Sequence, residues 1–158
     1  MSYAITGLIL GGIIGVGIIA APTLSVLPST HAPSLVDTAK IAKARTFTLC
    51  HTGGGTNCVV DGDTVWMDGV KIRVADIDAP ETHPPRCAYE AELGNRATER
   101  LYQLVNHGPF TAELTGSRDE DRYGRKLRVL MRNGQSLGGV LVQEGLARPW
   151  QGSRQPWC

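Results

Sequence analysis

The stretch VKIRVADI, Val70 to Ile77, predicts a central β-strand, and the other expected elements lie on both sides of it in the sequence. Apolar and polar side chains alternate along it, as they do in a β-strand that buries only one face. It follows Asp68-Gly69, a dipeptide typical of two-residue hairpin turns, after the extended segment Thr64–Met67. The pattern therefore predicts a half-buried hairpin at the centre of the domain.

Further elements are predicted on both sides of this hairpin. The clearest helix is Ala88–Asn106, whose apolar side chains recur with a 3.6-residue period. A shorter helix begins after Ser136 and ends at Gly145. Other strands are expected at 57–60, 110–114 and 126–132, and residues 46–50 are a further short strand candidate that is not counted among them. An order of three strands, a helix, two strands and a helix predicts an α+β fold dominated by β, a small five-stranded OB-fold barrel with two helices. A ferredoxin-like sandwich, βαββαβ, fits less well.

The N-terminal region differs in composition from this body. Every Asp, Glu, Lys and Arg lies at or beyond Asp37, and residues 4–21 form an apolar run. As a helix this run spans about 27 Å, close to the hydrocarbon thickness of a bilayer. We expect a signal peptide or membrane anchor over 1–27, a linker over 28–45 and the globular domain over 46–158. The first residues lack Lys and Arg, which favours an uncleaved anchor that would attach the chain to a membrane.

Four cysteines in a body of this size indicate an oxidising, extracytoplasmic compartment. We favour the pairs Cys50–Cys58 and Cys87–Cys158, the second of which would join the C-terminal segment to the middle of the domain. Free thiols in a cytosolic protein remain an alternative. A zinc site built from these cysteines and nearby histidines is a third one, although the paired C-x-x-C spacing of structural zinc sites is absent.

Two acidic turns could carry chemistry. The first is Asp61-Gly62-Asp63-Thr64, and the second runs from Asp76 through Asp78 to Glu81. Carboxylates that converge repel one another unless a hard cation holds them, and Ca²⁺ accepts such oxygen ligands in irregular geometry. Taken singly, each motif is more often an ordinary turn in which Asp bonds its own backbone. The role of Asp76 stays open.

Arginines beside these turns point to phosphate chemistry. The formal net charge is only +1, so binding of nucleic acid must depend on local arginines. Arg73 precedes the second acidic turn, and Arg125 follows a glycine turn; guanidinium groups match phosphate oxygens bidentately. Arg73 and Asp78 lie an odd number of positions apart, so a bulge or strand end must bring them to one face. A cation, arginines and a carboxylate base are what phosphodiester hydrolysis requires.

Four motifs together resemble those of the thermonuclease family, the micrococcal-nuclease-like OB-fold nucleases. They are VVDGDTV (59–65), IRVADIDAPET (72–82), DRYGR (121–125) and VLVQEGLA (140–147). The resemblance implies Ca²⁺ held by Asp63, Asp78 and the backbone carbonyl of Ala79. The best-known members of that family have threonine where Ala79 stands. Alanine at this position keeps the backbone carbonyl as a ligand but lacks the threonine hydroxyl and its contact.

The same resemblance implies roles at the reacting phosphate. Glu81 would position or deprotonate the attacking water, and Arg73 and Arg125 would clamp the phosphate. Arg122 and Tyr123 would contact the neighbouring nucleotide of a DNA or RNA substrate.

Two departures from the family pattern affect the C-terminal half. The lysine-rich loop after the glutamate is shortened to HPPRC (83–87), and the final long helix is missing. Trp150 or Trp157 would either replace a lost aromatic platform or serve in packing, and the four cysteines would substitute for the missing packing.

The sequence thus predicts a calcium-dependent endonuclease acting outside the cytoplasm without an obligate protein partner. One alternative is a catalytically silent OB-fold module that binds nucleic acid or protein. Another is a membrane-anchored spacer domain of the cell envelope.

Overall fold

A computed structural model of the chain describes residues 43–51 and 55–158, which belong to one compact unit. The expected signal peptide or anchor over 1–27, and the linker up to residue 42, lie outside the described residues. Within the described part, no helix is both long and apolar enough to cross a membrane.

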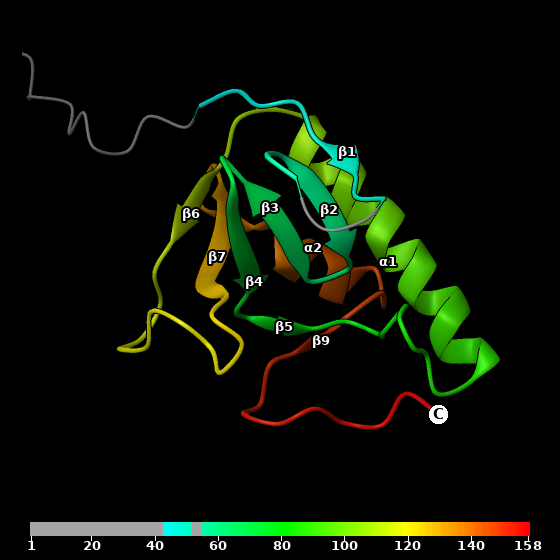
Figure 1. Cartoon of the computed structure of the whole chain (residues 1–158). Coiled ribbons are helices and arrows are strands. Elements are labelled where there is room, and N and C mark those ends of the chain that lie inside the picture. The colour runs from blue at the N-terminus through cyan, green and yellow to red at the C-terminus, as the bar shows by residue number, and fades with distance from the viewer. Residues whose placement is uncertain (1–42, 52–54) are drawn as a thin grey trace, which may run out of the picture. The chain divides into compact units, whose positions relative to one another are not determined.

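Most strands belong to one curved mixed sheet (Figure 1). Its order is β1 (Thr48–Leu49), β2 (Cys58–Asp61), β3 (Thr64–Met67), β4 (Val70–Val74), β7 (Lys126–Arg132) and β6 (Thr111–Glu113), with β8 (Gln135–Ser136) paired to β7. β1–β2 and β4–β7 are parallel, and the other pairs are antiparallel.

The sheet is open, so the predicted five-stranded barrel is wrong in its closure. No pairing among the described strands joins β6 to β1. These end strands have three and two residues, which leaves little backbone to bridge the gap between them. The prediction of a β-dominated α+β fold with two helices is confirmed.

The tight turns form as the sequence predicts. Asp68 and Gly69, between β3 and β4, have φ angles of 51° and 81°. Asn133 and Gly134, between β7 and β8, have φ angles of 50° and 78°. Positive φ at both central positions matches the right-handed twist of antiparallel strands and suits Asn-Gly and Asp-Gly dipeptides.

The strand predicted over Val70–Ile77 breaks before its end. β4 stops at Val74, and Ile77–Asp78 form β5, which pairs with β9 (Arg148–Pro149) in a separate two-stranded sheet. Neither β8 nor β9 was predicted, because two-residue strands carry no periodicity. The break between β4 and β5 is the strand end that the odd spacing of Arg73 and Asp78 required.

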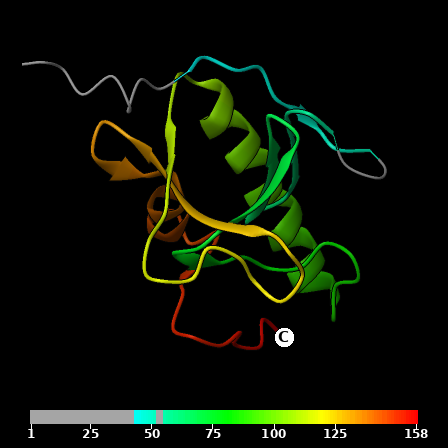
Figure 2. The same cartoon turned by 60° about the vertical axis from the view of Figure 1, so that its left-hand side comes forward.

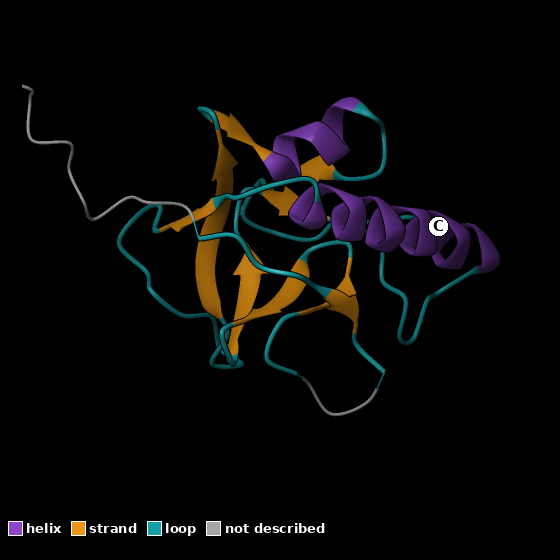
Figure 3. Ribbon diagram, turned by 90° about the horizontal axis from the view of Figure 1, so that it is seen from above, coloured by secondary structure: helices purple, strands orange, loops and turns teal. Residues whose placement is uncertain are grey.

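Two helices cover the sheet from one side (Figures 2 and 3). α1 (Ala88–Asn106) has the predicted bounds and packs on β2 and on α2 (Leu137–Gln143). Its apolar face, including Leu93, Ala97 and Leu101, is buried in the core. Ser136 caps α2 as predicted, because its hydroxyl accepts a hydrogen bond from Gly139 N at 3.0 Å.

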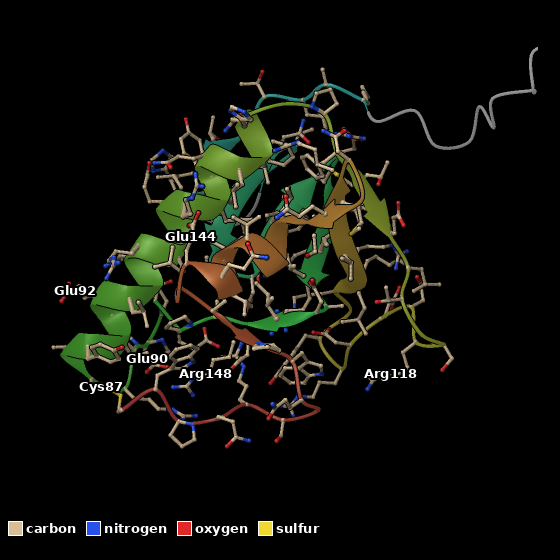
Figure 4. The ribbon with its side chains drawn as sticks, turned by 180° about the vertical axis from the view of Figure 1, so that it is seen from behind. Cys87, Glu90, Glu92, Arg118, Glu144 and Arg148 are labelled. Atoms are coloured by element: carbon tan, nitrogen blue, oxygen red, sulfur yellow. A yellow bond between two sulfur atoms is a disulfide. The ribbon has the colours of Figure 1, made fainter. Side chains whose placement is uncertain are left out.

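Both predicted disulfides are present. Cys50 is bonded to Cys58 at the β1–β2 edge, and Cys87 at the start of α1 is bonded to Cys158 (Figure 4). No cysteine of the described residues is free, so the thiol and zinc alternatives both fail.

The two disulfides are expected to contribute unequally to stability. They close loops with sequence separations of 8 and 71 residues. In the chain-entropy model these loops correspond to about 2.5 and about 4.4 kcal/mol. We predict that Cys87→Ser/Cys158→Ser lowers the free energy of unfolding by more than Cys50→Ser/Cys58→Ser does, as measured by urea denaturation of the globular body. Equal losses in the two double variants would contradict this ranking.

Candidate active site

The two acidic turns meet at the junction of β2, β3 and β5. Asp63 lies in the β2–β3 turn after a register shift in β2, and Asp78 ends β5. Asp63 Oδ2 accepts a hydrogen bond from Ala79 N at 3.1 Å, which ties one turn to the other. The side chains of Asp63 and Asp78 are almost fully buried, with 3% and 5% of their surface exposed. Ala79 is buried beside them.

Two glycines allow α1 to approach these turns. A Cβ atom at Gly62 would lie 2.7 Å from Ala97 Cβ in α1 and 2.9 Å from Ala79 Cβ. A Cβ atom at Gly94 would lie 2.8 Å from the Pro80 carbonyl oxygen. Only glycine fits at such distances. The helix therefore supports both the D-G-D turn and the segment that carries Glu81.

Arg73 lies in β4 and neutralises the buried carboxylates. Its Nη2 is 3.1 Å from Asp63 Oδ2 and 3.9 Å from Asp78 Oδ1. The guanidinium also donates to the Val74 carbonyl at 2.6 Å and to the Ile77 carbonyl at 2.9 Å. These bonds span the break between β4 and β5. The exposed Trp150 ring covers the guanidinium, with its centroid 5.7 Å from Cζ. Arg73 is thus held by two carboxylates, two backbone carbonyls and an aromatic ring.

Arg125 reaches the same site from the segment before β7. Its Nε donates to Asp121 Oδ2 at 2.7 Å, and its Nη1 donates to Thr64 Oγ1 at 3.2 Å. The Thr64 hydroxyl in turn donates to Asp63 Oδ1 at 3.0 Å. Thr64 therefore connects the second predicted arginine to the first predicted metal ligand.

Arg122 and Tyr123 lie on the solvent-exposed side of Arg125. The guanidinium of Arg122 is 4.7 Å from the Tyr123 ring centroid, and that of Arg125 is 5.5 Å from it. Tyr123 is 68% exposed. An exposed aromatic ring close to two guanidiniums at the rim of the site offers a stacking surface and positive charge.

Glu81 is the most exposed carboxylate of the predicted set, and Glu90 holds its backbone. Glu81 N donates to Glu90 Oε1 at 3.4 Å, and Arg86 N donates to Glu90 Oε2 at 2.6 Å. Glu90 itself is 2% exposed and lies in the first turn of α1 (Figure 4). It therefore organises the segment between Glu81 and the helix.

Arg154, which sequence reasoning did not select, faces all three carboxylates. Its Nη1 forms an ion pair with Glu81 Oε1. Its Nε lies 3.5 Å from Asp78 Oδ1, and its Nη2 lies 3.8 Å from Asp63 Oδ2. A single guanidinium can touch these three side chains only because they converge. The structure thus brings Asp63, Asp78 and Glu81 together, with Arg73 paired to the two aspartates and Arg125 linked to Asp63 through Thr64.

The crowding of charge shifts several pKa values. Burial, and then the nearby Asp63, raise the pKa of Asp61 to about 7. Burial also raises the pKa of Asp78, although Arg154 and Arg73 act in the opposite direction. Burial lowers the pKa of Arg73, which Asp63 partly offsets. The site is therefore a place where negative charge is concentrated and only partly compensated.

The donor atoms fit a hard cation. Asp78 Oδ1 is buried and accepts no hydrogen bond of good geometry from any described residue. The nearby indole N–H of Trp157 lowers the pKa of Asp78 and so favours its ionised form, although burial raises that pKa more. The predicted ligands supply only oxygen, as Ca²⁺ and similar cations require, and water would complete the coordination. The described residues contain no cluster of three or more His, Cys, Asp and Glu side chains arranged as a ready metal centre.

A cavity beside Asp78 does not unite the predicted residues. It measures about 150 Å³ and is lined by Asp78, Arg148, Pro149, Gln151, Ser153 and Gln155. Asp78 is the only member of the predicted set that it contains. Asp63, Asp78 and Glu81 instead meet around the side chain of Arg154, while Arg73 contacts Asp63 and Arg125 reaches it through Thr64.

Asp76 lies outside the carboxylate cluster. Its Oδ2 accepts a hydrogen bond of 2.5 Å from the Ser136 hydroxyl, and its carbonyl accepts one of 2.9 Å from Trp150 N. A Cβ atom at Gly138 would lie 2.9 Å from Asp76 Oδ1. Asp76 therefore positions the start of α2 and the chain after β9.

Four residues that support the site were missed in sequence reasoning. Thr64 and Asp121 lie inside quoted motifs, and Glu90 has the signal of an acidic residue in the first helical turn. Arg154 had none, because it is remote in sequence and follows no motif.

Comparison with known proteins gives consistent matches. A family model described as "Staphylococcal nuclease homologue" matches residues 71–156. Endonuclease YncB of Bacillus subtilis (strain 168) is 36% identical over 93 residues, covering 56% of this chain and 44% of its own length. SPbeta prophage-derived endonuclease YokF of the same strain is 36% identical over 93 residues, covering 56% and 31%. Micrococcal nuclease of Shigella flexneri is 35% identical over 103 residues, covering 56% and 53%. The chain thus matches about half or less of each relative's length.

The buried Glu90 carboxylate gives a test of how the Glu81 segment is held. Glu90→Ala would remove the carboxylate that accepts from the amides of Glu81 and Arg86, and a hydrogen bond to a charged group contributes about 1.5–3 kcal/mol. We predict a loss of about 2–4 kcal/mol in the free energy of unfolding and faster amide hydrogen exchange in residues 81–86. Glu90→Gln keeps one acceptor oxygen and should lose less. Unchanged exchange in Glu90→Ala would contradict the role assigned to this carboxylate.

Proposed function

This chain belongs to the family of staphylococcal nuclease homologues, and we propose that it is a metal-dependent endonuclease that hydrolyses phosphodiester bonds in DNA, RNA or both. The names of its relatives, which include two endonucleases and a micrococcal nuclease, support this activity. The site residues support it independently, since they supply each group that the reaction needs.

One observation carries the proposal. Three carboxylates and two arginines, from four separate segments, converge, and the guanidinium of Arg154 contacts all three carboxylates. Arg73 contacts Asp63 directly, and Arg125 reaches Asp63 through Thr64. Guanidiniums stay charged at any working pH and pair with two phosphate oxygens at once. A buried arginine and a partly buried one beside buried carboxylates suit a substrate whose phosphate adds negative charge and is bound together with a cation.

We assign a role to each side chain. Asp63, Asp78 and the Ala79 carbonyl would hold Ca²⁺, which neutralises charge on the phosphate oxygens when bound. Arg73 and Arg125 bind those oxygens and stabilise the additional charge of the transition state. Glu81, the exposed carboxylate, orients the attacking water and accepts its proton.

The rim of the site would bind the adjacent nucleotide. Tyr123 is exposed near the guanidiniums of Arg122 and Arg125, so a base can stack on the ring while an arginine meets the next phosphate. Such contacts do not depend on sequence, which agrees with a nuclease of broad specificity.

We propose that the protein works outside the cytoplasm. Two disulfides support this location, because reducing systems keep cytosolic thiols free. The apolar run over residues 4–21 supports export or attachment to a membrane. Cell fractionation tests this location, and recovery of the protein in the cytoplasmic fraction alone would refute it. Mass mapping without reductant tests the disulfides, and free thiols in the exported form would refute both pairs.

Metal dependence is the first test of the activity. We predict that the globular body cleaves single-stranded DNA with Ca²⁺ and stops when chelator is added, because the carboxylates then lack the cation. Matched DNA and RNA oligonucleotides, separated on denaturing gels, measure the rate on each. Full activity in excess chelator would remove the metal from the mechanism.

The second test concerns the arginine that Thr64 orients. We predict that Arg125→Ala lowers kcat by about 10²–10³-fold, the usual effect of removing one donor to a developing charge. Arg125→Lys should recover part of the lost kcat, because lysine restores the positive charge but cannot bind two phosphate oxygens at once as a guanidinium does. Arg118→Ala is the matched control on the same β6–β7 loop, because among the described residues the Arg118 side chain donates only to the Glu120 carbonyl. Thermal unfolding of each variant verifies the fold, and an Arg125→Ala enzyme as fast as the parent would exclude this role.

A further inference from the structure

The C-terminal segment, residues 150–158, crosses the candidate site and is anchored on both sides of it. At one end Trp150 N donates to the Asp76 carbonyl at 2.9 Å. At the other end Cys158 is bonded to Cys87 at the start of α1. Figure 1 shows this segment in red, running past β5 and β9 toward that helix. Arg154 lies between the two anchors.

A buried tryptophan fixes the segment between Arg154 and the disulfide. Trp157 is 9% exposed and belongs to the hydrophobic core. The guanidinium of Arg148 in β9 lies 3.7 Å from its ring centroid. Arg148 also donates to the Pro156 carbonyl at 3.0 Å. Arg148 in β9 therefore supports the C-terminal segment and is also paired, in the β5–β9 sheet, with Asp78 of the site.

The guanidinium of Arg154 occupies the position that a shared cation would need. It contacts carboxylate oxygens of Asp63, Asp78 and Glu81 together. A divalent cation bound to Asp63 and Asp78 would compete for these oxygens and would repel a guanidinium at a distance of a few ångströms. Arg73 cannot be the group that yields, because backbone carbonyls of Val74 and Ile77 hold it. Arg154 makes no such backbone contact among the described residues, and about a third of its side chain is exposed.

We propose that Arg154 is an intramolecular competitor of the divalent cation, held in place by the anchored C-terminal segment. This inference rests on the metal site of the proposed function. In the absence of cation, Arg154 compensates the three carboxylates and closes the site. Cation binding displaces the side chain, while the anchors at Trp150, Trp157 and Cys158 keep it near the site. The segment thereby raises the cation concentration at which the enzyme becomes competent.

The size of the effect follows from the fraction of molecules in which the site is open. The apparent Kd for a ligand equals the intrinsic Kd divided by the competent fraction. If Arg154 occupies the carboxylates in about 90% of molecules, the apparent Kd for Ca²⁺ is about tenfold higher than without it. Removing the guanidinium should therefore tighten Ca²⁺ binding, which is opposite to the effect of removing a ligand.

Calorimetric titration of Ca²⁺ into the globular body, without nucleic acid, tests the inference. Arg154→Gln should lower the apparent Kd by about 3- to 10-fold relative to the parent. Arg154→Lys retains a cation and should lie closer to the parent. Arg118→Gln, which makes the same change of charge away from the site, should leave the Kd unchanged. Thermal unfolding provides a second readout: Arg154→Gln should have a lower Tm in chelator and a larger rise in Tm on adding Ca²⁺.

Each outcome has a distinct meaning. Equal or weaker Ca²⁺ binding by Arg154→Gln, with binding by the parent, overturns the competition and leaves the metal site intact. Absence of Ca²⁺ binding in every variant overturns both the competition and the proposed metal site. Tighter binding by Arg154→Gln in a body that cleaves neither DNA nor RNA supports the competition and rejects the nuclease.

The anchor is tested separately with Cys87→Ser/Cys158→Ser, which leaves Cys50–Cys58 intact. Releasing the end of the segment lowers the effective concentration of Arg154 at the carboxylates. The apparent Kd for Ca²⁺ should fall toward that of Arg154→Gln, and adding Arg154→Gln to this variant should change it little. A further full decrease in the combined variant would show that the anchor has no part in the competition.

Discussion

Two carboxylates buried side by side are the constraint on which the site depends. Isolated charges are costly to bury, so Asp63 and Asp78 persist in the folded protein only because cations offset them. Arg73 supplies the permanent one, and the carbonyls of Val74 and Ile77 hold its guanidinium in place. The compensation is incomplete, since burial still raises the pKa of Asp78. A site with residual negative charge and an unbonded buried oxygen is suited to a further cation.

The scaffold around these carboxylates is built from breaks in regular structure. The register shift in β2 and the end of β4 bring Asp63 and Asp78 to one point. Gly62 and Gly94 then let α1 press against both turns. Because each feature sits at the end of an element, the strands and α1 provide rigidity while short turns carry the reactive groups.

The C-terminal segment links stability to the site. The expectation that cysteines substitute for packing is met in part, since a disulfide and the buried Trp157 act together. Of the two tryptophans considered from the sequence, Trp157 serves in packing, whereas Trp150 covers Arg73 from the solvent side. The same anchoring that completes the core therefore also delivers Arg154 to the carboxylates. Packing and charge compensation cannot be separated in this part of the chain.

The sequence by itself determined the elements with local signals: the bounds of α1, the turns at Asp68-Gly69 and Asn133-Gly134, and the cap at Ser136. Motif order also identified the residues that converge, and the two cysteine pairs that the sequence favoured are the ones that form. Periodicity and turn chemistry act over a few residues, so they are readable without coordinates. Only the tertiary structure decided the open sheet, the pairing of β5 with β9 and the places of Glu90 and Arg154. Those contacts join residues far apart in sequence, and their energies depend on burial, which no local pattern specifies.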